Sequence, residues 1–412
     1  RGTWAEINLN NIKHNFHALK NTLKSDTKVC CVVKADAYGH GAVEVAKMLQ
    51  QEKADYFSVA RFEEAVELRN NNIHTPILCM GYISECDIEE AIHRYIGITV
   101  YSYEMAKMIN EKAEKLGKKA SIHIKLDTGM SRLGFLTDDN SINDILKLKE
   151  LINLNIDGIY THFATADETD KKETYLQLER YKKVISALDK ANVNIIFKHV
   201  SNTAAIIDLK ELGFNMVRLG IGLYGCYPSD EVSKNTKLKP AMALKTIITN
   251  IKTVSPGTKV SYGYTYEFKE ESKLATLAIG YADGFDRTQN NPKVMINGVL
   301  CDVVGRICMD QCMVKIPEGL NVNIEDEYKQ AYERFYESLS KTDDLILFNL
   351  DKNGIEGYIG YESFAELSNL VVKKIQEDNN HKIYIYKMPS KEVGCYDEIK
   401  HFLKLGYIEL FK

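Results

Sequence analysis

Residues 28–41 read KVCCVVKADAYGHG, an apolar run that passes directly into a polar, glycine-containing segment. The segment that follows, AVEVAKMLQQ, carries apolar side chains at helical spacing. A short apolar run that ends in polar residues and leads into an amphipathic helix is typical of one βα unit of a parallel sheet. This stretch therefore predicts a strand, a loop and a helix in that order.

The same pattern recurs as far as residue 225. Amphipathic stretches separate eight apolar runs, which are KVCCVVKA, YFSVAR, PILCM, GITVYS, SIHIKLDTG, GIYTHF, IIFKHVSN and MVRLGIGLYG. Eight alternations within roughly 200 residues match the smallest (β/α)8 barrels better than an open sheet. We therefore predict an α/β fold, a TIM-like (β/α)8 barrel, over residues 1–238.

The pattern changes after Lys239. β-Branched runs now alternate with Gly- and Pro-containing turns, as in KTIITNIKTVSPGTKVSYGYTY. This predicts a separate, mainly β domain over residues 239–390. Within it, residues 321–343 are charged, aromatic and helix-favouring, so we expect a helical insertion there. The tail, residues 391–412, is expected to form a small helical appendage.

Composition limits the classes of function. The 412 residues include 53 basic and 57 acidic side chains, a formal net charge of −4, with no block of like charge suited to nucleic acid. The nine cysteines fall in no paired framework, which favours a reducing, cytoplasmic compartment. No run is long enough for a transmembrane helix, and we predict no metal site. The chain begins at Arg1, so the sequence also allows the cytoplasmic domain of a longer protein.

Polar residues follow most of the eight runs, where a barrel enzyme carries its active site. Lys34 closes the first run, and an amine that leaves an apolar strand is partly desolvated, which favours its neutral, nucleophilic form. A lysine at a strand end is more often a solvated edge residue, so a functional role for Lys34 depends on which polar residues accompany it at the other strand ends. The candidate partners after the later runs are Lys125, Asp127, Arg132, His162, Asn202, Thr203, Arg218 and Gly220.

At these residues the chain resembles a known family. VVKADAYGHG resembles the pyridoxal 5′-phosphate (PLP) attachment signature of alanine racemases. Later segments resemble the family's successive blocks in the same order: KLDTGMSRLGF, THFATADE, HVSNTAA, VRLGIGLYG, VSYGYTY, LAIGYADG and GRICMDQCMV. The resemblance runs from Thr3 to about Ile316. It implies the cofactor PLP, a small amino-acid substrate, and a homodimer in which each β domain completes the partner's site.

The resemblance also implies a two-base racemase. Lys34 matches the lysine that holds PLP as a Schiff base and acts on one face of the substrate α-carbon, and Tyr262 matches the base on the opposite face. A phenol with a pKa of roughly 10 needs neighbours that favour its ionised form, a task that matches His162 and, through it, Arg218. Arg218 also matches the arginine that faces the pyridine nitrogen of PLP. Because a guanidinium cannot accept a proton, that nitrogen should stay unprotonated and transamination should be suppressed.

The remaining roles follow from the same resemblance. The residues that match cofactor contacts are Tyr38, Asn202, Thr203, Gly220, Ile221 and Tyr361. Those that match substrate contacts are Arg132, Met309, Asp310 and Tyr281. The segment GYIGYE around Tyr361 departs from the closing block of the family, which loosens that match. Lys125 matches a lysine that is often carbamylated, which would place an anion beside Arg132; the alternative is an unmodified Lys125 paired with Asp127.

Four alternatives stay open at this point. Family relatives that racemise serine differ around the pocket near Tyr361, although a bulky tyrosine there favours alanine. An amino-acid decarboxylase on the same barrel is disfavoured by Arg218, because those enzymes place a carboxylate at the pyridine nitrogen. A PLP-binding regulatory protein is disfavoured by the β domain that carries Tyr262. A barrel with no cofactor would make all the polar groups at the strand ends accidental. By family analogy, D-alanine would supply cell-wall peptide precursors.

Overall fold

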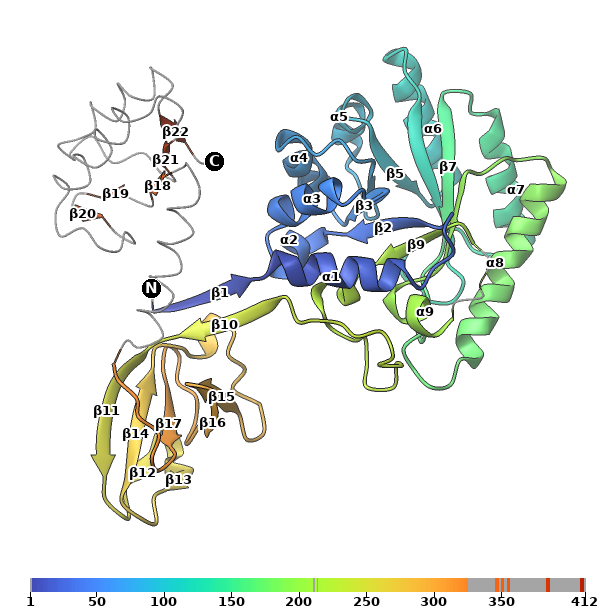
Figure 1. The fold of residues 1–412 in the computed structure, drawn as a ribbon. Coiled ribbons are helices and arrows are strands. Elements are labelled where there is room, and N and C mark those ends of the chain that lie inside the picture. Colours follow the sequence, from blue (N-terminus) through green and yellow to red (C-terminus); the bar gives the residue numbers. More distant parts are fainter. Residues whose placement is uncertain are drawn as a thin grey trace. The chain divides into compact units, whose positions relative to one another are not determined.

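The structure, a computed structural model, describes residues 2–209, 212 and 214–324, together with five short strands further along the chain. The chain divides into two compact units, one formed by Glu6–Ala243 and the other by Leu244–Lys412 together with Arg1–Ala5 (Figure 1). We call them the barrel unit and the β unit. Their boundary follows Ala243, whereas the sequence pattern put it after residue 238.

The barrel unit contains a closed barrel of eight parallel strands, β2 to β9. These are β2 (Lys28–Val32), β3 (Tyr56–Val59), β4 (Ile77–Cys79), β5 (Ile96–Val100), β6 (Ala120–Lys125), β7 (Leu154–Tyr160), β8 (Phe197–His199) and β9 (Met216–Leu219). The last strand pairs with the first, so that Arg218 lies opposite Cys30. Each of the eight apolar runs supplies one strand, and the prediction of a TIM-like barrel is confirmed.

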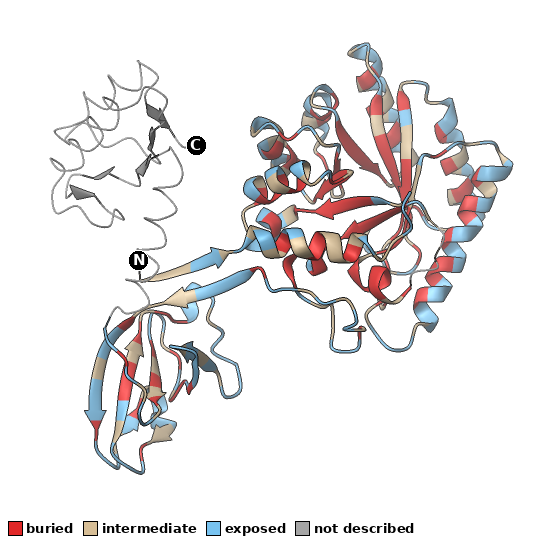
Figure 2. Ribbon diagram, in the orientation of Figure 1, coloured by how far each residue is buried: buried red, intermediate tan, exposed pale blue. Residues whose placement is uncertain are grey.

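Helices connect the strands. They are α1 (Leu9–Lys20), α2 (Lys34–Gly39), α3 (Ala42–Gln51), α4 (Phe62–Asn70), α5 (Ile88–His93), α6 (Tyr103–Lys115), α7 (Asp139–Lys147), α8 (Lys172–Lys190) and α9 (Thr203–Asp208), with 3-10 turns η1 (Glu85–Asp87), η2 (Leu148–Glu150) and η3 (Ile221–Tyr224). Several begin at a side-chain cap. The Ser102 hydroxyl accepts the Met105 N–H in the first turn of α6, and the Asp138 carboxylate accepts the Ser141 N–H in the first turn of α7. Their outer faces are exposed and their inner faces buried (Figure 2).

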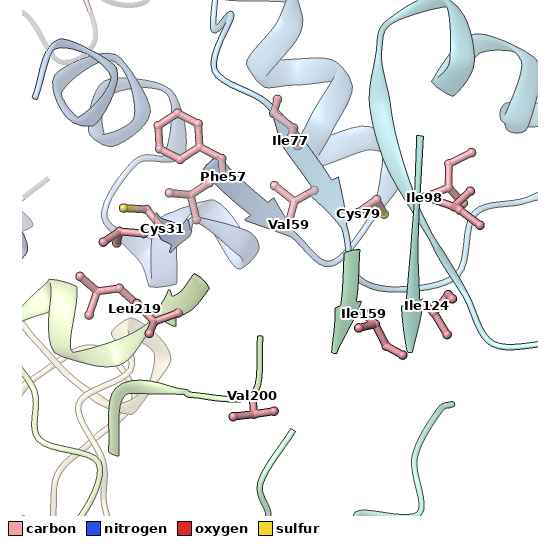
Figure 3. Packing of buried hydrophobic residues seen from close by; sticks show 14 of the residues in the cluster. Cys31, Phe57, Val59, Ile77, Cys79, Ile98, Ile124, Ile159, Val200 and Leu219 are labelled. Carbon is pink, nitrogen blue, oxygen red and sulfur yellow. The ribbon is translucent and has the colours of Figure 1, made fainter. Parts of the chain in front are cut away.

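Two sets of strand side chains form the core of the barrel unit. Outward-facing residues such as Phe57, Ile77 and Ile98 are fully buried between the strands and the helices (Figure 3). Each contributes roughly 1.5–3 kcal/mol by leaving water. The alternate residues face the barrel interior, where Tyr56 and Tyr160 belong to a smaller apolar cluster. Buried polar side chains share that interior, and they lead to the site described below.

Up to residue 324 the β unit contains short strands paired into antiparallel sheets, which confirms the predicted mainly β domain. Its central sheet pairs β11 (Ile248–Val254), β14 (Ser272–Leu277) and β17 (Cys312–Ile316) over a core that includes Ala275 and Val314. Asn297-Gly298, both at positive φ, turn the hairpin of β15 (Lys293–Ile296) and β16 (Val299–Asp302). The other elements are β1 (Thr3–Ile7), β10 (Met242–Thr246), β12 (Lys259–Val260), β13 (Tyr266–Glu267), η4 (Tyr262–Tyr264) and η5 (Tyr281–Asp283).

Beyond residue 324 the structure describes only β18 (Leu345–Leu347), β19 (Leu350–Asp351), β20 (Gly354–Ile355), β21 (Ile383–Ile385) and β22 (Ile408–Leu410). Most of the predicted insertion at 321–343 and of the tail at 391–412 therefore lies outside the described residues. The tail was predicted to be helical, yet its residues Ile408–Leu410 form a strand that pairs in parallel with β21. An apolar, charged, apolar alternation favours a strand, and this part of the prediction was wrong. Among the described helices, none has the length and apolar character needed to cross a membrane.

Candidate active site

Lys34 opens a turn of unusual backbone geometry at the carboxyl end of β2. The four residues that follow it, Ala35 to Tyr38, have φ values of 51°, 52°, 52° and 56°, so this part of α2 is a left-handed turn formed by residues other than glycine. Each such residue costs about 1–2 kcal/mol relative to a right-handed conformation. The backbone next to Lys34 is therefore strained, and the surrounding structure must hold it.

Two carboxylates hold this turn. The Ala35 N–H donates to Oε1 of Glu64 at 2.7 Å, and the Ala42 N–H donates to Oδ1 of Asp36 at 2.7 Å. The second oxygen of Glu64 accepts the Ala60 N–H at 2.8 Å, which ties the turn after β2 to the end of β3. Sequence reasoning missed Glu64, because a carboxylate in the first turn of an amphipathic helix looks like an ordinary surface residue.

Arg218 lies inside the barrel with its side chain almost fully buried. Nη1 donates to the carbonyl oxygen of His199 at 3.0 Å and contacts its Nδ1 at 2.9 Å. Nη2 donates to the carbonyl oxygens of Thr161 at 2.6 Å and Val200 at 3.2 Å, and lies 3.4 Å from Nδ1 of His162. No ion pair within the described residues includes Arg218. Its hydrogen bonds there all leave from Nη1 and Nη2, so the Nε–H remains available to another acceptor.

His162 lies where several cations meet. Burial, and after it the positive charges of Arg218, Arg132, Lys125 and Lys34 in that order, together lower the pKa of its imidazole to about 3. The imidazole is therefore neutral at pH 7. Its position also shows that these four basic side chains converge on one end of the barrel, and that end suits an anionic ligand.

Lys125 is buried next to this cluster. Its Nζ donates to the carbonyl oxygens of Leu126 at 2.7 Å and Leu133 at 3.1 Å. The Oδ1 of Asp127 instead accepts two backbone N–H groups of the following turn. Burial, and next the charge of Arg218, lower the pKa of Lys125 to about 8. The amine is thus held by carbonyl oxygens, and the paired carboxylate considered for it is engaged elsewhere.

A small cradle forms at the ends of β8 and β9. The Thr203 hydroxyl oxygen accepts the N–H of Gly220 at 3.2 Å and that of Gly222 at 3.3 Å. A Cβ on Gly220 would lie 3.3 Å from the hydroxyl of Tyr38, and one on Gly222 would lie 2.6 Å from Cγ2 of Thr203. Asn202 caps the helix that begins at Thr203. The structure thus brings Tyr38, Asn202, Thr203 and Gly220 to one place.

The residues predicted in the β unit form a cluster of their own. Tyr262 is 65% exposed and follows Ser261, whose hydroxyl lies 3.5 Å from Sγ of Cys308. The Tyr281 N–H donates to the Cys308 carbonyl at 3.0 Å, and the next N–H donates to the carbonyl of Met309 at 2.9 Å. The cluster comprises Tyr262, Tyr281, Met309 and the exposed Asp310.

Two of the remaining predicted residues lie on the barrel and one outside the described residues. Arg132 is exposed, and it is close enough to lower the pKa of both His162 and Lys125. Ile221 opens η3 directly after Gly220 and is 37% exposed. Tyr361 lies outside the described residues.

Two further side chains, Tyr160 close to Arg218 and Thr99 hydrogen-bonded to Tyr160, were not identified from the sequence. The Tyr160 hydroxyl shares a hydrogen bond of 2.9 Å with Thr99, and its ring stacks on His199 at 4.8 Å. The guanidinium carbon of Arg218 lies 5.2 Å from the centre of the same ring. The available signal was alternation along the strand, because Tyr160 lies two residues before His162 at the end of an apolar run.

The fold and the basic groups at its strand ends define a two-unit (β/α)8-barrel protein with a site suited to a small anion. Residues 7–228 match the family model of the alanine racemase N-terminal domain, and residues 241–344 match that of the C-terminal domain. The chain belongs to the alanine racemase family, which confirms the resemblance seen in the sequence.

Individual relatives agree with this assignment. The alanine racemase of Methanococcus maripaludis is 50% identical over 324 residues, which cover 78% of this chain and 87% of that protein. Alanine racemase 1 of Clostridium acetobutylicum is 43% identical over 373 residues, covering 90% and 94%. A solved structure of an alanine racemase from Clostridium difficile 630 is 52% identical with a TM-score of 0.74, and the match covers 79% of this chain and 85% of that one.

Proposed function

We propose that this chain is a PLP-dependent racemase that interconverts L-alanine and D-alanine, with Lys34 and Tyr262 as its two bases. The observation that carries the proposal is the setting of Arg218. It is a buried cation that rests on carbonyl and imidazole acceptors, with an Nε–H left for one further acceptor. An unprotonated pyridine nitrogen is such an acceptor, whereas a decarboxylase on the same barrel would need a carboxylate in this position.

The described residues fit PLP at three further points. The cradle of Thr203, Gly220 and Gly222 excludes larger side chains, as a loop that approaches a phosphate closely must. Lys34, at a strand end beside it, is only partly exposed. The cations around His162 suit the phosphate and the ring oxygen of PLP as well as an amino-acid carboxylate. When bound, PLP supplies an electron sink that acidifies the hydrogen on the α-carbon of the amino acid.

Racemisation needs one group to remove that proton and another to return it from the opposite side. Lys34 holds the cofactor and serves one face. Tyr262 of the partner subunit serves the other, in a homodimer whose two sites are each completed by the second chain. Met309, Asp310 and Tyr281 of the partner would border the same substrate. We propose that Tyr361, which lies outside the described residues, is the tyrosine that restricts the substrate side chain to the size of alanine's.

His162 helps to explain how a tyrosine could act as a base. Its Nδ1 faces Arg218, which can only donate, so the proton of the neutral imidazole is on Nε2. That Nε2–H can donate to a phenolate oxygen, and such a bond favours the ionised form of Tyr262. The planar guanidinium of Arg132 can donate two parallel hydrogen bonds to the carboxylate of the substrate.

We also propose that Lys125 is carbamylated. Carbon dioxide adds to a neutral amine, and a pKa of about 8 leaves roughly a tenth of the amine neutral at pH 7, against roughly 0.03% for a pKa of 10.5. The carbamate would place a negative charge near Arg218 and Arg132, whose positive charges disfavour a protonated Lys125. Mass spectrometry of the peptide that contains Lys125, prepared without acid, should show one added carbon dioxide; an unmodified peptide would end this part of the proposal.

The decisive experiment is a chiral assay of the purified protein with PLP and either L-alanine or L-serine. We expect D-alanine to form much faster than D-serine, and no amine product of decarboxylation. The protein should be yellow, with an absorbance band that borohydride shifts. Lys34→Ala should lose the band, whereas Lys198→Ala, which removes a lysine of β8 whose partner is Asp189, should keep it.

Three results would contradict the proposal. A colourless protein that takes up no PLP would exclude a PLP enzyme. A faster reaction with serine would change the substrate, and a decarboxylated product would change the reaction. We expect the enzyme to act in the cytoplasm, since the eight cysteines among the described residues are all free thiols.

A further inference from the structure

A chain of three buried side chains runs through the interior of the barrel. The Nη1 of Arg218 on β9 lies 2.9 Å from Nδ1 of His199 on β8. The Nε2 of His199 lies 3.0 Å from Nδ1 of His123 on β6. The two histidines have no exposed surface, and Arg218 is only 2% exposed. Water therefore cannot substitute freely for any partner in the chain.

Arg218 fixes where the protons of both histidines lie. A guanidinium has only donors, so Nδ1 of His199 must accept and the proton of that neutral imidazole is on Nε2. The His199 Nε2–H then donates to Nδ1 of His123, whose own proton is consequently on Nε2. Burial lowers the pKa of His123 to about 3 and that of His199 well below its usual value, with the charge of Arg218 acting in the same direction. Both rings stay neutral.

The orientation of His123 carries an energetic cost. Its Nε2–H is buried and has no hydrogen-bond partner among the described residues, which costs about 1–3 kcal/mol. The ring is nevertheless held in this orientation. It stacks on Phe197 at 6.3 Å and meets Tyr56 edge-on at 5.7 Å. It also fills the space opposite Gly158, where a Cβ would lie 2.2 Å from Nδ1 of His123. An apolar side chain would fill the same space and remove the unpaired Nε2–H of residue 123, but it would leave the buried Nε2–H of His199 without its acceptor.

We propose that His123 is a positioning residue for Arg218: it accepts the Nε2–H of His199 and so fixes the imidazole on which Nη1 of Arg218 rests. Arg218 depends on such support because no carboxylate among the described residues pairs with it. The consequence for the reaction rests on the proposed function, since the Nε–H that His123 helps to aim is the one offered to the cofactor. The proton arrangement itself does not depend on any ligand.

The proton arrangement can be tested directly by nuclear magnetic resonance of the protein labelled with ¹⁵N at histidine, with and without PLP. We expect His199 and His123 to appear as neutral Nε2–H tautomers at pH 7, with an N–N coupling across the hydrogen bond between them. A proton on Nδ1 of His123, a charged ring, or no coupling would overturn the proposal. This outcome is independent of whether the enzyme racemises alanine.

Variants separate positioning from packing. His123→Asn keeps an acceptor near the position of Nδ1, His123→Leu removes it at similar volume, and Ser58→Ala removes another buried, unpartnered polar group from the same barrel as a control. For His123→Leu we expect PLP to bind about fivefold more weakly, the effect of one lost hydrogen bond, and a larger share of turnovers to end in transamination. His123→Asn should stay within about twofold of the wild type, and Ser58→Ala should be unchanged.

Equal losses in His123→Asn and His123→Leu would assign His123 to packing alone, and no loss in His123→Leu would exclude any role in aiming Arg218. If His123→Leu does not fold, the proposal is still tested by the tautomers of His199 and His123 that nuclear magnetic resonance detects in the wild-type protein. A wild-type protein that binds PLP but does not racemise alanine would refute the proposed function and leave the tautomer and affinity results standing.

Discussion

Ala35→Gly should make the protein more stable, although the same substitution destabilises most helices. Ala35 is exposed and has a φ of 51°, the first of four consecutive residues in the left-handed turn after Lys34. Glycine adopts this conformation without the clash of a Cβ. The substitution removes a methyl group that faces solvent, so it tests backbone strain and little else.

The size of the effect follows from two opposing terms. Relief of the left-handed strain stabilises the folded state by about 1–2 kcal/mol, and the greater freedom of glycine in the unfolded chain costs about 0.4–1 kcal/mol. The net gain is about 0.5–1 kcal/mol. For a unit of this size it should raise the melting temperature of the barrel transition by roughly 1–4 °C, which scanning calorimetry of the full chain can resolve.

Ala187→Gly provides the matched control. Ala187 lies within the right-handed helix α8, where glycine costs about 1 kcal/mol relative to alanine, so its melting temperature should fall. The test is whether the two alanine-to-glycine substitutions shift the melting temperature in opposite directions. If Ala35→Gly lowers the melting temperature as Ala187→Gly does, the turn after Lys34 is not strained, and the role given to its two carboxylate clamps is wrong.

Three further predictions concern the site. Gly222→Ala would place a Cβ 2.6 Å from Thr203 Cγ2, so Thr203 must move, and we expect the Kd for PLP to rise about tenfold while circular dichroism stays unchanged. Burial lowers the pKa of Lys125 from 10.5 to about 8, so the unfolded chain binds that proton more tightly. In buffers free of carbon dioxide, where Lys125 carries no carbamate, the free energy of unfolding should therefore rise between about pH 8 and 10.5 relative to Lys125→Met, and an equal pH dependence of the denaturation midpoints of the two proteins would contradict the shift. Tyr262→Phe should keep the PLP absorbance band but lose exchange of the α-proton from one enantiomer; unchanged exchange of both would exclude Tyr262 as a base.

The sequence by itself determined the barrel. Alternation of apolar runs with helical stretches is a local property, because a strand buried on both faces must be apolar and a helix that covers it must be amphipathic. The same reasoning located Lys34 and Arg218 at or near strand ends, where barrel enzymes carry their sites. It failed at Ile408–Leu410, where a short alternation within a charged tail forms a strand instead of a helix.

Only the tertiary structure decided how the site is supported. The closed barrel brings His123 of β6, His199 of β8 and Arg218 of β9 into one hydrogen-bonded chain, although His123 and His199 are 76 residues apart in the sequence. The left-handed turn after Lys34 depends on Glu64, which reaches it from the next βα unit. No local pattern marks His123 or Glu64, since a histidine inside a strand and a glutamate on a helix are ordinary in their own segments. Their roles arise when strand pairing fixes which side chains share a buried space, where an unpaired donor or acceptor is costly.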